Sequence, residues 1–147
     1  MTLCCEISLR YGDVDRQGHV NNSAVLQIVE SARLVLWARA GLGVNPGQVI
    51  RRQSIDYLSP ISADHTSVRV EHECATIGNT SYVLRFRVCG TDGTLFCDGS
   101  ILMVAVDGHG TPHPIPAALK RELAALTPDA NGADDVSSVG LQGGVAQ

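Results

Sequence analysis

Apolar and polar residues alternate over the first ten positions of the chain. This period of two predicts a half-buried β-strand. The following segment, 11–22, is rich in Gly, Asp and Asn and is not periodic. At its end Asn21 or Asn22 is suited to cap a helix, because a short polar side chain can accept from the free amides of a first turn. The apolar side of the predicted strand consists of Leu3, Cys5, Ile7 and Leu9.

Apolar residues then recur at spacings of three and four from Ser23 to about Ala40, which predicts a long helix. Other apolar residues cover more of its circumference, so we expect the helix to be enclosed by the rest of the protein. Gly41 and Gly43 are suited to end it. The recurring positions are Val25, Ile28, Val29, Ala32, Leu36 and Ala40.

Most of the remaining chain predicts β-strands, at 49–58, 67–77, 81–89 and 95–106. Turn residues at Gly78-Asn79 and Asp92-Gly93 join the last three as hairpins, and successive strands with short turns form a meander in an antiparallel sheet. A short helix is predicted over 117–126. The simplest architecture is α+β, with an antiparallel sheet wrapped around one long central helix. We expect one domain over residues 1–127 and a disordered tail over 128–147, which is rich in Gly, Ala and Asp.

Composition excludes several classes of protein. The 147 residues fit one domain, and a net charge of -4 without a basic cluster argues against nucleic acid or a membrane surface as partner. The five cysteines include no CxxC pair, so we expect neither a disulfide framework nor a metal site. His72 lies on an apolar strand face, where a hydrogen-bonded structural histidine is expected. Without a signal peptide or an apolar run of about 20 residues, a cytoplasmic location is expected.

Residues suited to chemistry are concentrated just before the long helix. Asp13 and Asp15 precede its predicted start, and His19 and the pair Asn21-Asn22 are within a few residues. The free amides of a helix N-terminus can polarise a carbonyl group and stabilise an oxyanion on it. A carboxylate opposite that carbonyl could act as a general base or as a nucleophile. The local pattern fits an acyl-transfer site, and it fits an ordinary polar loop equally well.

The segment RYGDVDRQGHVNNSAVLQIVESAR resembles the signature of hotdog-fold thioesterases of the 4-hydroxybenzoyl-CoA thioesterase type. That signature is Asp-x-Asp-x-x-Gly-His-Val-Asn-Asn, followed on the helix by Glu-x-x-Arg, here Glu30 and Arg33. Three further segments resemble the family's later strands and closing helix: SIDYLSPI, IGNTSYVLRFRV and ILMVAVDGHGTPHPIPAALKREL. The resemblance covers roughly residues 5–125. It implies the hotdog fold and the hydrolysis of an acyl-CoA thioester to free acid and CoA, with no cofactor because CoA is part of the substrate.

The resemblance also implies roles for single residues. Asp15 matches the catalytic carboxylate, and the backbone amide of Asn22 matches the donor to the thioester carbonyl. His19 lies in the same turn and either positions water or holds the loop, while Asp13 matches a second, structural acid. Where this chain has Val25 the family often has a tyrosine, so the acyl pocket should differ. The substrate-binding positions implied are Gly18, Asn21, Val25 and, near the nucleotide end of CoA, Ser81.

The family's smallest unit is a dimer whose sheets join edge to edge, so a homodimer or homotetramer is expected. Other functions remain open at this point. They are an acyl-carrier-protein thioesterase, an enoyl-thioester hydratase, whose motif is not seen, and a non-catalytic acyl-CoA binding protein. The sequence does not separate a CoA substrate from a carrier-protein substrate. It also does not define the acyl group or show whether Asp15 acts as base or nucleophile.

Overall fold

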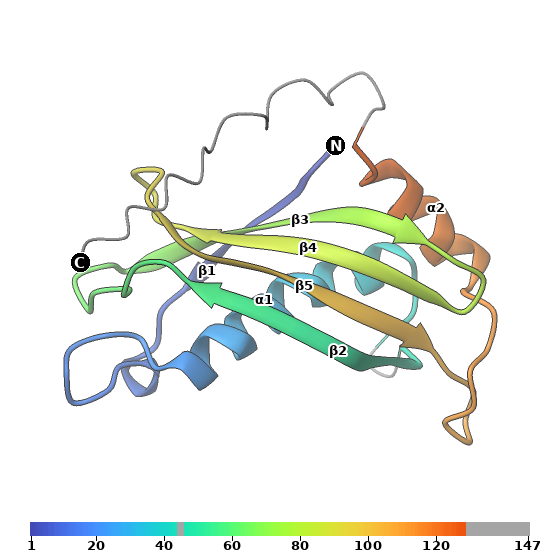
Figure 1. Ribbon diagram of the computed structural model, residues 1–147, viewed down its shortest axis with the longest axis horizontal. Coiled ribbons are helices and arrows are strands. Elements are labelled where there is room, and N and C mark those ends of the chain that lie inside the picture. The colour runs from blue at the N-terminus through green and yellow to red at the C-terminus, as the bar shows by residue number, and fades with distance from the viewer. Residues whose placement is uncertain (44–45, 129–147) are drawn as a thin grey trace, which may run out of the picture.

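The computed structural model describes residues 1–43 and 46–128 (Figure 1). The predicted disordered tail begins at Pro128, and residues 129–147 lie outside the described residues. Both helices and all five strands agree with the predicted segments to within about two residues at each end. The elements in chain order are β1 (Leu3–Ser8), the short 3-10 helix η1 (Tyr11–Asp13), α1 (Asn22–Arg39), β2 (Gln48–Tyr57), β3 (Ser67–Ile77), β4 (Ser81–Cys89), β5 (Leu95–Ala105) and α2 (Ala117–Ala125).

The strands form one antiparallel sheet in the order β1-β3-β4-β5-β2. Strands β3, β4 and β5 form the predicted meander through tight turns. The expected meander is wrong for β2, which precedes β3 in the chain but pairs with β5 at the opposite edge. The segment 58–66 between them is too long for a hairpin and carries the chain across the sheet (Figure 1). It thereby passes close to the start of α1.

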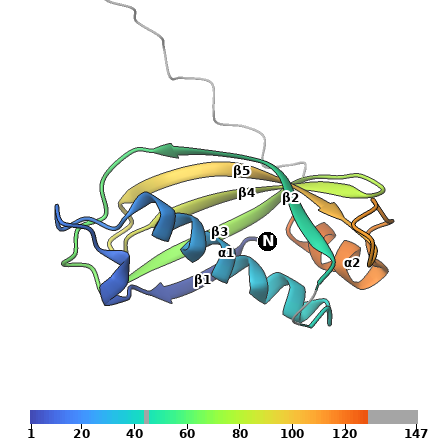
Figure 2. The same cartoon turned by 90° about the horizontal axis from the view of Figure 1, so that it is seen from below.

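Helix α1 packs lengthwise against one face of the sheet (Figure 2). Asn21 caps it as predicted, because its side chain accepts from the Ser23 amide. The prediction that the helix is enclosed holds for one side only. Gln27, Glu30, Ser31 and Leu34 remain exposed, because the sheet covers one side of the helix and α2 lies at its far end. The side toward the sheet consists of Ala24, Val25, Ile28, Val29, Ala32, Arg33, Leu36 and Trp37.

Two polar side chains, Arg33 and His72, are buried within the core. Arg33, which interrupts the apolar pattern, is buried with its guanidinium 5.5 Å from the centre of the Trp37 ring, and its Nε has no hydrogen-bond partner in the described chain. His72 is buried on β3 and neither ring nitrogen has a partner among the described residues, so the expected hydrogen-bonded role is wrong. Burial and the nearby charge of Arg33 lower the pKa of His72 to about 4. The ring is therefore neutral at pH 7.

Candidate active site

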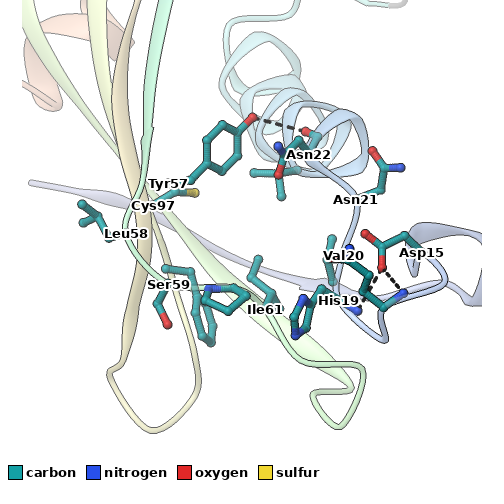
Figure 3. Close-up of a pocket in the computed structure, with 14 residues that line it drawn as sticks. Asp15, His19, Val20, Asn21, Asn22, Tyr57, Leu58, Ser59, Ile61 and Cys97 are labelled. Carbon is teal, nitrogen blue, oxygen red and sulfur yellow. Dashed lines mark hydrogen bonds between the residues drawn. The ribbon is translucent and has the colours of Figure 1, made fainter.

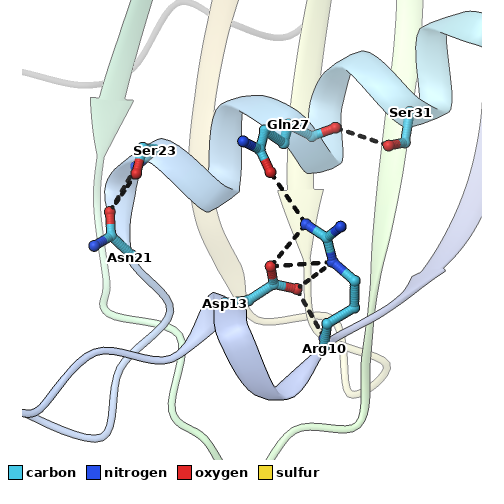
Figure 4. Close-up of polar contacts among 6 residues, drawn as sticks. All are labelled: Arg10, Asp13, Asn21, Ser23, Gln27 and Ser31. Atoms are coloured by element: carbon cyan, nitrogen blue, oxygen red, sulfur yellow. Dashed lines mark hydrogen bonds and ion pairs between the residues drawn. The ribbon is translucent and has the colours of Figure 1, made fainter.

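The loop between β1 and α1 is held by a buried carboxylate. Asp13 accepts hydrogen bonds from the backbone amide of Arg10 at 2.8 Å and from its guanidinium at 2.9 Å. Arg10 also donates to Gln27 on α1, which connects the loop to the helix (Figure 4). Burial alone raises the pKa of Asp13, but hydrogen bonds and the charge of Arg10 outweigh it and lower the pKa overall. Asp13 is thus an ionised anchor of the loop.

Asp15 lies in a tight turn closed by its own side chain. Its Oδ1 accepts from the amides of Gln17 at 2.8 Å and His19 at 3.3 Å, and its amide donates to the His19 carbonyl at 2.8 Å. Gly18 has a φ of 75°, in the left-handed region that favours glycine. Within residues 1–43 and 46–128 the second oxygen, Oδ2, receives no hydrogen bond. The turn therefore fixes the carboxylate and leaves one oxygen free.

The segment after β2 supports this turn from the other side. The Val20 amide donates to the Ile61 carbonyl, and the Ala63 amide donates to the Gly18 carbonyl, both at 2.8 Å. His19 and Ser62 form an isolated antiparallel bridge. The segment 58–66, which connects β2 to β3, thus holds the Asp15 turn against the start of α1.

Helix α1 begins beside the same turn. The Asn21 side chain accepts from the amide and the hydroxyl of Ser23 at 2.9 and 2.7 Å, so it is occupied as a cap (Figure 4). The amide of Asn22, the first helical residue, donates to no atom in the part of the chain that the structure describes. A helix N-terminus carries a partial positive charge, so this free amide can bind a carbonyl oxygen or an oxyanion.

These groups line a pocket of about 440 Å³ (Figure 3). The Asp15 turn and the start of α1 form one wall. The end of β2, the segment after it and the start of β5 form the other. The predicted site residues that line this pocket are Asp15, His19, Asn21, Asn22 and Val25; the further lining residues are Gln17, Val20, Tyr57, Leu58, Ser59, Pro60, Ile61, Phe96 and Cys97.

Two predicted site residues do not line the pocket. Gly18 lies within the Asp15 turn and acts on its backbone shape. Ser81 begins β4 opposite Val104, whereas the pocket residue Cys97 is seven residues earlier on β5 and opposite Val88. Seven residues of strand span roughly 23 Å. Within one chain, Ser81 is therefore at the other end of the sheet from the pocket, and its role stays a prediction.

Sequence reasoning missed the wall that faces Asp15. Tyr57 ends β2, and its hydroxyl donates to the Asn22 carbonyl at 3.5 Å across the pocket (Figure 3). Burial, with Cys97 adding to it, raises the pKa of Tyr57. Burial raises the pKa of Cys97 to about 12, so this thiol is protonated at neutral pH. The Tyr-Leu-Ser-Pro run that ends a predicted strand was the available signal for this wall.

Two further structural findings concern metal binding and membrane spans. Over residues 1–43 and 46–128, no group of three or more His, Cys, Asp or Glu side chains is placed to hold a metal ion. In the same part of the chain, no helix is long and apolar enough to cross a membrane.

The sequence and the fold were compared with known proteins. Residues 9–123 match the family described as the thioesterase-like superfamily. A comparison with curated protein sequences finds no match. Similar solved structures include a thioesterase from Thermus thermophilus complexed with coenzyme A and Zn, with 29% identity and a TM-score of 0.74, covering 84% of this chain and 92% of that one. A Pseudomonas aeruginosa protein has 26% identity and a TM-score of 0.79, covering 86% and 92%.

A third structure, a 1,4-dihydroxy-2-naphthoyl-CoA thioesterase from Synechocystis, has a TM-score of 0.74 at 16% identity, covering 86% of this chain and 98% of that one. At this identity it bears on the fold alone. The chain belongs to the thioesterase-like superfamily, and the predicted hotdog fold is confirmed. The family and the Thermus neighbour support the broad class of thioester hydrolase.

Proposed function

We propose that the protein hydrolyses an acyl-CoA thioester to free acid and CoA, as a thioesterase of the 4-hydroxybenzoyl-CoA type. The observation that carries this proposal is the pocket, in which the free carboxylate oxygen of Asp15 and the free amide of Asn22 lie on one wall beside apolar side chains such as Val25. The Thermus neighbour that binds coenzyme A supports CoA as the carrier. We expect no metal or other cofactor to take part.

In the proposed reaction, the thioester carbonyl oxygen accepts from the Asn22 amide, which stabilises the oxyanion as it forms. Asp15 either removes a proton from a water molecule that attacks the carbonyl carbon, or attacks that carbon itself. In the second case the resulting anhydride is hydrolysed by water. In both cases the C–S bond breaks and CoA leaves as thiolate, which takes up a proton. His19 holds the Asp15 turn through its backbone and is near enough to the pocket to orient water.

Release of free thiol from a panel of acyl-CoAs tests this function. The panel combines straight-chain, branched and aromatic acyl groups, and a thiol reagent follows the reaction. We expect turnover of at least one class. If no CoA ester releases thiol but an acyl-carrier protein substrate does, the carrier is wrong and the reaction stands. Tight binding of acyl-CoA without turnover would instead favour a non-catalytic binding protein.

We also propose that the protein forms a homodimer or homotetramer in the cytoplasm through the edge of β2. This ten-residue strand has no neighbour on its outer edge in the described chain, and Val49 and Ile50 are both 46% exposed. Long unpaired strand edges are normally covered. Light scattering should therefore give a multiple of 15.6 kDa. Replacing Val49 and Ile50 with lysine should give the monomer, whereas Leu34→Lys on the exposed side of α1 should not; a monomeric wild type would contradict the proposal.

A further inference from the structure

We propose that Tyr57 closes the end of the pocket between β2 and α1 and limits the site to short, uncharged acyl groups. This inference rests on the proposed function and names its substrate class. It concerns Tyr57, which is distant from Asp15 in the sequence and lines the same pocket in the folded chain.

The first observation is where the pocket stops. Tyr57 is the earliest residue of β2 to line it, and Val25 is the last residue of α1 to do so. The Tyr57 ring extends from the strand toward the first turn of the helix, where its hydroxyl meets the Asn22 carbonyl (Figure 3). The ring thus spans the distance between β2 and α1 at the point where the pocket ends.

The second observation is that the sheet surface continues, partly exposed, beyond the ring. In the sheet register Tyr57, Ile55 and Gln53 are paired with Cys97, Gly99 and Ile101, so they share the sheet face toward α1. Ile101 is fully buried on that face, but Gln53 is exposed and Ile55 is partly buried. The inner face of β2 is therefore uncovered in the described chain. A longer acyl chain could lie along it if the Tyr57 ring did not stand between this strip and the pocket.

The third observation is the chemistry of the interior. Among the described residues, no Lys or Arg lines the pocket, and its only carboxylate is Asp15. A carboxylated acyl group would find no cation there and would meet the charge of Asp15. Apolar side chains in the lining include Val20, Val25, Ile61 and Phe96. An uncharged apolar acyl group fits this lining.

These observations predict a particular dependence on chain length. Each additional methylene buried in an apolar pocket contributes enough to raise kcat/KM by about fourfold. The rise should stop abruptly where the acyl chain reaches the ring. The hydroxyl bond at 3.5 Å is long, so the ring itself, and not its hydrogen bond, should set the limit.

The test is kcat/KM for straight-chain acyl-CoAs from acetyl to palmitoyl. Wild type, Tyr57→Phe and the control Tyr11→Ala, which loses a fully exposed tyrosine, should share one optimum. Tyr57→Ala should move the optimum at least two carbons longer and raise kcat/KM for longer chains at least tenfold. Tyr57→Trp should move it shorter, which keeps the test decisive if the alanine variant does not fold. An unchanged optimum in both the Ala and Trp variants, or a shift in Tyr57→Phe as large as in Tyr57→Ala, would overturn the proposal.

Measuring the binding of acyl-CoA distinguishes a failure of this inference from a failure of the proposed function. The same acyl-CoA series is titrated into wild type and the Tyr57 variants by calorimetry. If wild type binds but hydrolyses none of these esters, the proposed function fails, and the chain-length limit in binding still decides the role of Tyr57. If the affinity is independent of acyl chain length both in wild type and in Tyr57→Ala, the chain-length limit is refuted. This holds even where hydrolysis is observed.

Discussion

Replacing Asp15 with asparagine should lower kcat/KM for thioester hydrolysis by about 10²–10⁴-fold, the usual cost of losing a general base. Asparagine keeps a side-chain oxygen at the position of Oδ1, which accepts from the amides of Gln17 and His19. The turn should therefore keep its shape while the site loses its negative charge. The measurement is thiol release with an acyl-CoA that wild type hydrolyses, together with thermal unfolding of both proteins.

A matched control for this variant exists at the far end of β5. Oδ1 of Asp107 accepts from the amides of His109 at 2.8 Å and Thr111 at 3.0 Å, in a turn of the same kind that does not line the pocket. Asp107→Asn should keep wild-type activity. If Asp15→Asn retains more than a tenth of wild-type kcat/KM, Asp15 is neither the base nor the nucleophile. If both variants lose activity equally, the effect comes from turn structure.

Local periodicity in the sequence predicted the elements well because each depends on a repeat of two or of about 3.6 residues. The bounds of β3 and β4 agree with the predicted ones, and α1 differs by one residue at each end. Gly78-Asn79 predicted its hairpin for the same reason, since turn chemistry is local. The Asp15 turn and the start of α1 could also be predicted, because they are contiguous in the sequence.

Features that depend on pairing between distant segments could not be predicted in this way. Nothing local shows that β2 pairs with β5, and this pairing is what brings Tyr57 and Cys97 to face Asp15. Arg33 looked like a polar interruption of the helix, but its position on the face toward the sheet places it in the core. The pocket wall that includes Tyr57 and Cys97 depends on tertiary packing, and so does the burial of Arg33.

The largest effect on stability that we expect comes from His72, which is buried together with Arg33 in the core. His72 has a pKa of about 4 in the folded protein, because of burial and the charge of Arg33, against its ordinary value of 6.5. The unfolded chain therefore takes up this proton first as the pH falls. Stability is fully retained above pH 6.5 and is lost progressively down to about pH 4, with a total loss of about 3 kcal/mol.

Urea unfolding at pH 7.5, 6.5, 5.5 and 4.5 would measure this loss. Asp13, Asp92 and Asp107 have lowered pKa values, so their contribution to stability is lost mainly as the pH falls through and below their ordinary value of 3.8. The window from 6.5 to 4.5 therefore belongs mainly to His72. His72→Leu should abolish most of the slope in this window. It should cost little at pH 7.5, because neither ring nitrogen has a partner in the described chain to lose.

His109→Leu is the matched control, since this histidine is exposed in a turn. It should leave the slope between pH 6.5 and 4.5 as it is in wild type. A wild type equally stable at pH 6.5 and 4.5 would show that His72 takes up a proton without cost, which would contradict the lowered pKa that its burial and Arg33 produce. Equal slopes in wild type and His72→Leu would assign the acid sensitivity to other groups. Loss of the slope in His72→Leu alone would show that the buried His72 makes this fold sensitive to mild acid.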